Sequence, residues 1–134
     1  MATISLVLAG LTVLLLVCGT WTFTQKVLLA LIICMFLHFY EEFEFPGGFP
    51  YMGVKVMLGS NETDSQKWGV NNLNSLFGNW GFLLLVYILP LFVPNVRFLT
   101  LAAVLFAFLE CFMHLILFNA RLKQVYNPGM ITGG

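Results

Sequence analysis

Residues 27–45 read VLLALIICMFLHFYEEFEF, and this stretch decides the class of fold. Its first eleven residues are all apolar, and the whole stretch approaches the length of about 20 residues that a transmembrane helix needs. Ionisable side chains then appear at His38, Glu41 and Glu42, inside the same run. Such groups are costly in a bilayer unless they are paired, and they usually face a bundle interior or a wet cavity. The stretch therefore predicts a membrane helix that carries a functional site near one end.

The composition of the whole chain supports the same class. Hydrophobic residues make up 60% of the 134 positions and charged residues 9%, against roughly 25% charged residues in soluble proteins. A soluble domain of this size would lack the polar surface to cover such a core. Six Lys and Arg residues balance six Asp and Glu residues, so no basic surface predicts a nucleic-acid partner. We expect one integral membrane domain over residues 1–134.

The distribution of apolar runs predicts an all-α, polytopic transmembrane bundle of about four helices. Lys26 marks the expected turn between the first two helices, and Pro46, Pro90 and Pro94 fall at expected helix ends because proline interrupts helical hydrogen bonding. The expected helices cover residues 3–24, 27–45, 74–93 and 96–120, and the polar loop between the second and third covers residues 46–73.

The basic residues predict the orientation of this bundle. Four crossings place the loop and both termini on one side of the membrane, and that side carries the larger share of Lys and Arg. The basic residues are Lys55, Lys67, Arg121 and Lys123 on the loop side against Lys26 and Arg97 on the other. We therefore expect a multi-pass protein of the lipid bilayer whose long loop and both termini are cytoplasmic.

Two expected helices carry histidine and glutamate on one face. At about 100° per residue, Glu42 lies about 40° from His38, and Glu41 lies about 60° away on the other side. Glu110 and His114 are four residues apart, a spacing that brings two side chains to the same face of a helix. Since both helices end on the loop side, both histidines lie at a similar depth, about 10 Å below one surface.

This combination of residues favours a metal site. Three carboxylates beside two imidazoles repel one another unless some are protonated or a cation lies between them. Two histidines with one to three carboxylates suit Zn²⁺, Mn²⁺ or Fe²⁺. We predict that the ligands are His38, Glu42, Glu110 and His114, and that Glu41 acts as general base. The alternative is a set of structural Glu–His pairs that fixes helix packing.

Four segments of the chain together resemble a known family. They are His38-x-x-Glu41-Glu42, FPGGF at residues 45–49, Glu110-x-x-x-His114 and YNPG at residues 126–129. Over residues 38–132 the chain resembles the HXXEE-motif family of small membrane proteins. The resemblance implies a membrane location and a key motif but no reaction. Because members of that family generally continue into another apolar helix after the Asn-Pro-Gly segment, we expect a chain truncated before a fifth helix or a short member.

The sequence leaves three functions open. The first is an intramembrane metal-dependent hydrolase of a lipid or lipid-linked substrate, in which a glutamate activates a metal-bound water. The second is a protein that handles protons or cations, because His–Glu chains form proton relays. Four helices are few for a transporter, so this function requires a homo-oligomer. The third is a scaffold in which the His/Glu cluster is a packing device.

Overall fold

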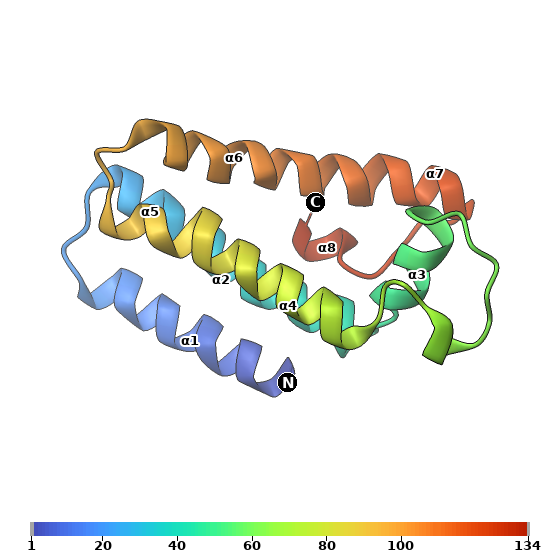
Figure 1. Cartoon of the computed structure of the whole chain (residues 1–134). Helices are drawn as coiled ribbons and strands as arrows, with labels where there is room; N and C mark the ends of the chain where they lie inside the picture. The colour runs from blue at the N-terminus through green and yellow to red at the C-terminus, as the bar shows by residue number, and fades with distance from the viewer. Residues whose placement is uncertain (1, 134) are drawn as a thin grey trace.

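All regular elements of the described chain are helical, as the sequence predicts. The computed structural model describes residues 2–133, apart from the side chains of Ala2 and Asn72 (Figure 1). Its helices are α1 (Ala2–Cys18), α2 (Phe23–Phe43), α3 (Phe49–Val56), α4 (Asn72–Phe82), α5 (Leu89–Phe92), α6 (Arg97–Phe112), α7 (Asn119–Leu122) and α8 (Met130–Gly133). Short π-helical segments, Leu83–Ile88 and Met113–Phe118, join α4 to α5 and α6 to α7, so each pair forms one continuous rod.

Three helices in the described residues are long and apolar enough to cross a membrane. They cover Phe23–Phe43, Leu73–Phe92 and Arg97–Leu122. The first helix, α1, is apolar but has 17 residues, which is shorter than the roughly 20 residues of a typical span. By length and composition these are the helices of a membrane protein, while the prediction of about four crossings is not confirmed.

The turn between the first two helices lies earlier than the sequence prediction placed it. We expected residues 3–24 to be helical and the turn to fall at Lys26, but α1 ends at Cys18 and α2 begins at Phe23. The Trp21 indole donates to the Leu15 carbonyl at 2.7 Å, which also accepts from the Gly19 amide at the end of α1. Thr22 and Gln25 then form a capping box that starts α2, since each side chain accepts from the backbone N–H of the other.

The helix α2 is the centre of the bundle. It packs against α1, α6 and α8, and also against the rod that contains α4 and α5. Figure 1 shows α1 and α6 on opposite sides of the layer formed by α2 and α4. Nearly half of the buried hydrophobic side chains in the described residues belong to α2, including Leu28, Leu29, Ile32, Phe36 and Phe39. Burial explains the apolar side chains of residues 27–37 that face neighbouring helices, while Ala30, Cys34 and Leu37 form an exposed apolar face of α2.

The two segments beyond the long helices are also folded. The predicted loop at residues 46–73 contains α3 and a 3-10 turn at Ser65–Lys67. At the other end, Lys123 adopts a left-handed conformation with φ 54°, which ends α7 and lets the chain reverse. The following residues return between α6 and α2 as α8 (Figure 1). This return brings residues 126–133, the C-terminal segment, onto the ionisable face of α2.

Candidate metal centre

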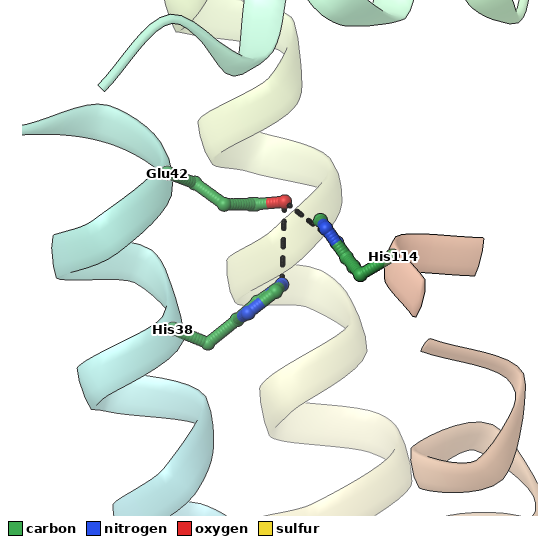
Figure 2. Close-up of side chains that lie close together, drawn as sticks. All are labelled: His38, Glu42 and His114. Atoms are coloured by element: carbon green, nitrogen blue, oxygen red, sulfur yellow. Dashed lines mark ion pairs between the residues drawn. The ribbon is translucent and has the colours of Figure 1, made fainter. Parts of the chain in front are cut away.

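Three side chains from two helices converge on one point inside the bundle. Glu42 lies one turn after His38 on α2, and its Oε1 is 3.2 Å from His38 Nε2. His114 comes from the π-helical segment Met113–Phe118, and its Nε2 is 3.4 Å from the same carboxylate oxygen. Figure 2 shows the Glu42 carboxylate between the two imidazoles. The predicted convergence of these three residues is thus present in the structure.

The three groups are shielded from solvent. His38, Glu42 and His114 are 3%, 2% and 0% exposed. A buried carboxylate is expensive unless a positive charge lies beside it. The Glu42 carboxylate is therefore neutralised by its own proton, by a protonated imidazole or by a cation bound between the three groups.

The spacing of the three groups fits a metal ion. One ligand atom from each residue lies within 4.8 Å of the other two. A tetrahedral ion bonded at about 2.1 Å holds its ligand atoms roughly 3.4 Å apart, close to the 3.2 Å and 3.4 Å separations from Glu42. Helical bundles commonly assemble such ligands from facing helices.

Asn127 fixes the orientation of the His114 ring. Its Oδ1 is 2.6 Å from His114 Nδ1, while its Nδ2 donates to the His114 carbonyl and to Asn119 Oδ1 at 2.7 Å and 2.8 Å. Because the amide nitrogen is engaged as a donor, Oδ1 accepts and the His114 proton lies on Nδ1. In the neutral ring the lone pair is then on Nε2, which is buried and lies 3.4 Å from Glu42 Oε1 and 3.6 Å from Glu110 Oε2.

Thr132 has a similar place beside the other imidazole. Its hydroxyl donates to Glu41 Oε2 at 2.6 Å, so the Thr132 hydroxyl oxygen is left to accept from His38 Nδ1, 3.4 Å away. Both histidines therefore direct Nε2 towards Glu42 and offer Nδ1–H to an oxygen. Metal-binding histidines are usually held in this manner, because the second hydrogen bond fixes the tautomer and the ring orientation.

The remaining two predicted site residues occupy different positions. Glu110 Oε2 is 3.6 Å from His114 Nε2, and 25% of its side chain is exposed. Glu110 therefore lies at the edge of the cluster. Glu41 is buried on a neighbouring face of α2, where its carboxylate contacts the C-terminal segment. The structure thus brings four of the five predicted residues together and directs the fifth elsewhere.

Four donors of the C-terminal segment surround the Glu41 carboxylate. Oε1 accepts from the Tyr126 hydroxyl at 2.7 Å and from the Ile131 amide at 3.1 Å. Oε2 accepts from the amide and the hydroxyl of Thr132 at 2.9 Å and 2.6 Å. Partial burial of the ring and the hydrogen bond to Glu41 raise the pKa of Tyr126 to about 12. Glu41 thus anchors the segment that holds both imidazoles.

Two glycines let this segment pass directly over the imidazoles. A Cβ atom added at Gly129, where φ is 94°, would lie 2.7 Å from His38 Cε1 and 3.0 Å from His114 Nδ1. One added at Gly133 would lie 2.8 Å from His38 Cε1. Side chains at these positions would displace the rings, so glycine is required for the close approach.

Comparison with known proteins gives one match. A family model described as protein of unknown function with HXXEE motif matches residues 28–134. The chain belongs to this family. No curated protein and no solved structure matches the chain significantly.

The HXXEE motif occupies His38, Glu41 and Glu42, and the structure separates its two glutamates. Glu42 faces the two imidazoles, whereas Glu41 holds the C-terminal segment. Nothing in the sequence alone assigned a role to Asn127, Gly129, Thr132 or Gly133. The YNPG sequence at residues 126–129 was the one signal that pointed to this segment.

A cavity lies beside the cluster of His38, Glu42 and His114. It has a volume of about 330 Å³, and His38, Glu42 and Glu110 line one part of it. Asn79 of α4 also lines it and donates to Glu42 Oε2 at 3.4 Å. The carboxylate of Glu42 is thus the meeting point of the two imidazoles and the cavity wall.

Proposed function

We propose that this protein is an intramembrane metal-dependent hydrolase. The observation that carries the proposal is the convergence of two oriented imidazoles and one carboxylate in a buried site beside a cavity. A packing device would not need the cavity. Two histidines and one glutamate form a ligand set of catalytic zinc sites, in which a fourth position stays open for water or substrate.

In this proposal, His38, Glu42 and His114 hold the ion. Zn²⁺ is our first choice, and Mn²⁺ and Fe²⁺ suit the same ligand types. When bound, the ion lowers the pKa of a coordinated water to near 7. The hydrogen bonds from Nδ1 of both histidines keep the ligand set in place during turnover.

Glu110 is the better placed carboxylate for the role of general base. The sequence prediction gave this role to Glu41, but both oxygens of Glu41 accept hydrogen bonds from the C-terminal segment. Glu110 lies beside His114, is partly exposed and lines the cavity. A general base must come within hydrogen-bond reach of the proton that it removes. We therefore reassign the base to Glu110 and leave Glu41 as a positioning residue.

The reaction that we propose is hydrolysis of a carboxylic ester or amide. Glu110 removes a proton from water, and the water oxygen bonds to the acyl carbon of the substrate. The bond from that carbon to the leaving oxygen or nitrogen then breaks, and Glu110 returns the proton to the leaving group. The products are a carboxylic acid and an alcohol or amine. The substrate is a lipid, since the site lies among helices with the length and composition of membrane spans.

The proposal keeps the predicted orientation, with the long loop and both termini in the cytoplasm. The excess of basic residues on that side supports it. The ionisable cluster then lies close to the cytoplasmic surface, where water for hydrolysis is available.

Metal analysis of purified protein tests this function first. We expect about one equivalent of metal per chain in the wild type and none in His38→Ala or His114→Ala, because each loses one of three ligands. Glu44→Gln is the matched control, because it removes an exposed carboxylate two residues beyond Glu42. Glu110→Gln should keep the metal and lose hydrolysis of lipid esters.

Three results would redirect the assignment. Metal-free wild-type protein that stays folded would make the cluster a buried ion pair and a packing device. Metal-free protein that conducts protons across vesicles would favour the relay. Iron as the bound metal would favour oxygen chemistry, for which two histidines and one carboxylate are the usual ligands.

A further inference from the structure

One face of α4 forms a wall of the cavity beside the cluster of His38, Glu42 and His114. Ser75, Gly78, Asn79 and Phe82 all line it, and their spacing of three and four residues places them on one side of the helix. Gly78 leaves this wall open at its middle, since a Cβ added there would meet nothing within 4 Å. The absence of a side chain at this position therefore creates part of the space.

The facing walls are mainly apolar. The helix α6 contributes Phe106 and Leu109, and α2 contributes Met35 beside His38. The volume of about 330 Å³ is at the lower end of the roughly 300–1,000 Å³ that ligand pockets have. A space of this size accepts one hydrocarbon chain more readily than two.

The polar groups in the cavity argue against an anionic ligand. Ser75 Oγ is buried and has no hydrogen-bond partner among the described residues, so it is free to donate to an oxygen of a ligand. No lysine or arginine occurs among the described residues that line the cavity. A phosphate or sulfate headgroup would thus lack the cationic partner that such groups normally bind, and it would face the carboxylates of Glu42 and Glu110.

The rim of the cavity lies on two candidate membrane spans. Phe82 and Leu109, which both line the cavity, are 48% and 52% exposed. They belong to the helical rods Leu73–Phe92 and Arg97–Leu122. Exposed apolar side chains on such helices face hydrocarbon, so a ligand can enter from the bilayer between the two rods.

We propose that this cavity binds an uncharged single-chain lipid, such as a monoacylglycerol or a fatty amide. Its hydrocarbon chain lies between α4 and α6, its oxygen accepts from Ser75, and its acyl carbon faces Glu42 and Glu110. This proposal rests on the proposed hydrolase function and specifies its substrate class. It excludes phospholipids and other lipids with an anionic headgroup.

Photolabelling with two probes tests the proposal on the full chain in lipid nanodiscs. The first probe is an uncharged alkylglycerol ether with a diazirine in its chain, which cannot be hydrolysed. The second carries the same chain on a phosphate headgroup. We expect the uncharged probe to label peptides of α4 and α6, with competition by a monoacylglycerol, and the phosphate probe to label at least tenfold less.

Gly78→Leu should reduce labelling by the uncharged probe at least tenfold, because the leucine side chain fills the cavity. Gly81→Leu is the matched control. Gly81 lies on the same helix, its added Cβ also meets nothing within 4 Å, and it is not among the described lining residues. It should label as the wild type does. Ser75→Ala barely changes the volume and should weaken binding about two- to tenfold through loss of one hydrogen bond, which keeps the test valid if Gly78→Leu fails to fold.

Metal content measured on the same samples separates the two proposals. Equal labelling of Gly78→Leu and wild type, or stronger labelling by the phosphate probe, would overturn the lipid site even if metal is present. Specific labelling of a metal-free protein, abolished by Gly78→Leu, would keep the lipid site and overturn the hydrolase.

Discussion

Replacement of Asn127 by alanine should weaken metal binding without removing a ligand. Asn127 is fully buried and makes three hydrogen bonds, to the His114 ring, the His114 carbonyl and Asn119, at 2.6, 2.7 and 2.8 Å. At about 1 kcal/mol net for each bond, the free energy of unfolding should fall by about 3 kcal/mol. The loss of the acceptor at Nδ1 frees the ring to change tautomer and orientation. Loss of such an outer partner typically costs about 10–100-fold in metal affinity. We expect a loss of the same size in Asn127→Ala.

Asn119→Ala separates the two effects. Asn119 accepts the third of these bonds and also donates to the carbonyl of Val125 at 3.2 Å, so its loss also destabilises the segment. No hydrogen bond among the described residues joins Asn119 to the His114 imidazole. Zinc affinity, measured by competition with a chromophoric chelator in detergent micelles, should therefore fall in Asn127→Ala and stay within about threefold of wild type in Asn119→Ala. Equal affinities in Asn127→Ala and wild type would refute the reasoning, as would equal losses in the two variants.

Three further predictions concern the C-terminal segment. In thermal unfolding, Gly129→Ala should destabilise the fold by several kcal/mol more than Gly59→Ala. Both glycines have positive φ, 94° and 62°, and an alanine in that conformation costs about 1–2 kcal/mol at either position. Only at Gly129 does an added Cβ also meet the imidazoles. Glu41→Gln should increase amide hydrogen exchange at Ile131 and Thr132 at least tenfold, and unchanged exchange would show that the carboxylate does not hold the segment. The phenol of Tyr126, identified by difference absorbance against Tyr126→Phe, should titrate at about 12 rather than 10. Because the raised pKa belongs to the folded state, its contribution to stability is full below pH 10 and disappears as pH rises towards 12. Titration at the ordinary value would contradict the combined effect of ring burial and the hydrogen bond to Glu41.

Pairings within one helix were predictable because they depend on helical geometry alone. His38 and Glu42 are four residues apart, as are Glu110 and His114, and any helix places such pairs on one face. The start of α2 was also encoded locally: Thr22 and Gln25 form a capping box of the expected spacing, but we placed the turn at Lys26 because a charged residue in an apolar run was the more obvious interruption. The capping box and Lys26 were competing local signals, and the capping box marks the true start of α2.

The sequence determined the class of this protein by itself. Long apolar runs can satisfy their backbone groups in a bilayer only as helices, so the composition of residues 27–45 predicted a helix long and apolar enough to cross a membrane, as the structure has it. It also determined which residues were chemically unusual, since ionisable side chains in apolar helices are rare and costly. These conclusions depend on composition and on distances of a few residues along the chain.

Only the tertiary structure decided what each ionisable residue contacts. The neighbouring residues Glu41 and Glu42 differ in partner because the C-terminal segment, about 90 residues away, donates four hydrogen bonds to the first. The left-handed turn at Lys123 and the glycines at 129 and 133 allow that segment to return onto α2. Helical periodicity carries no information about such a return, because its energy comes from contacts between elements that are distant in the chain.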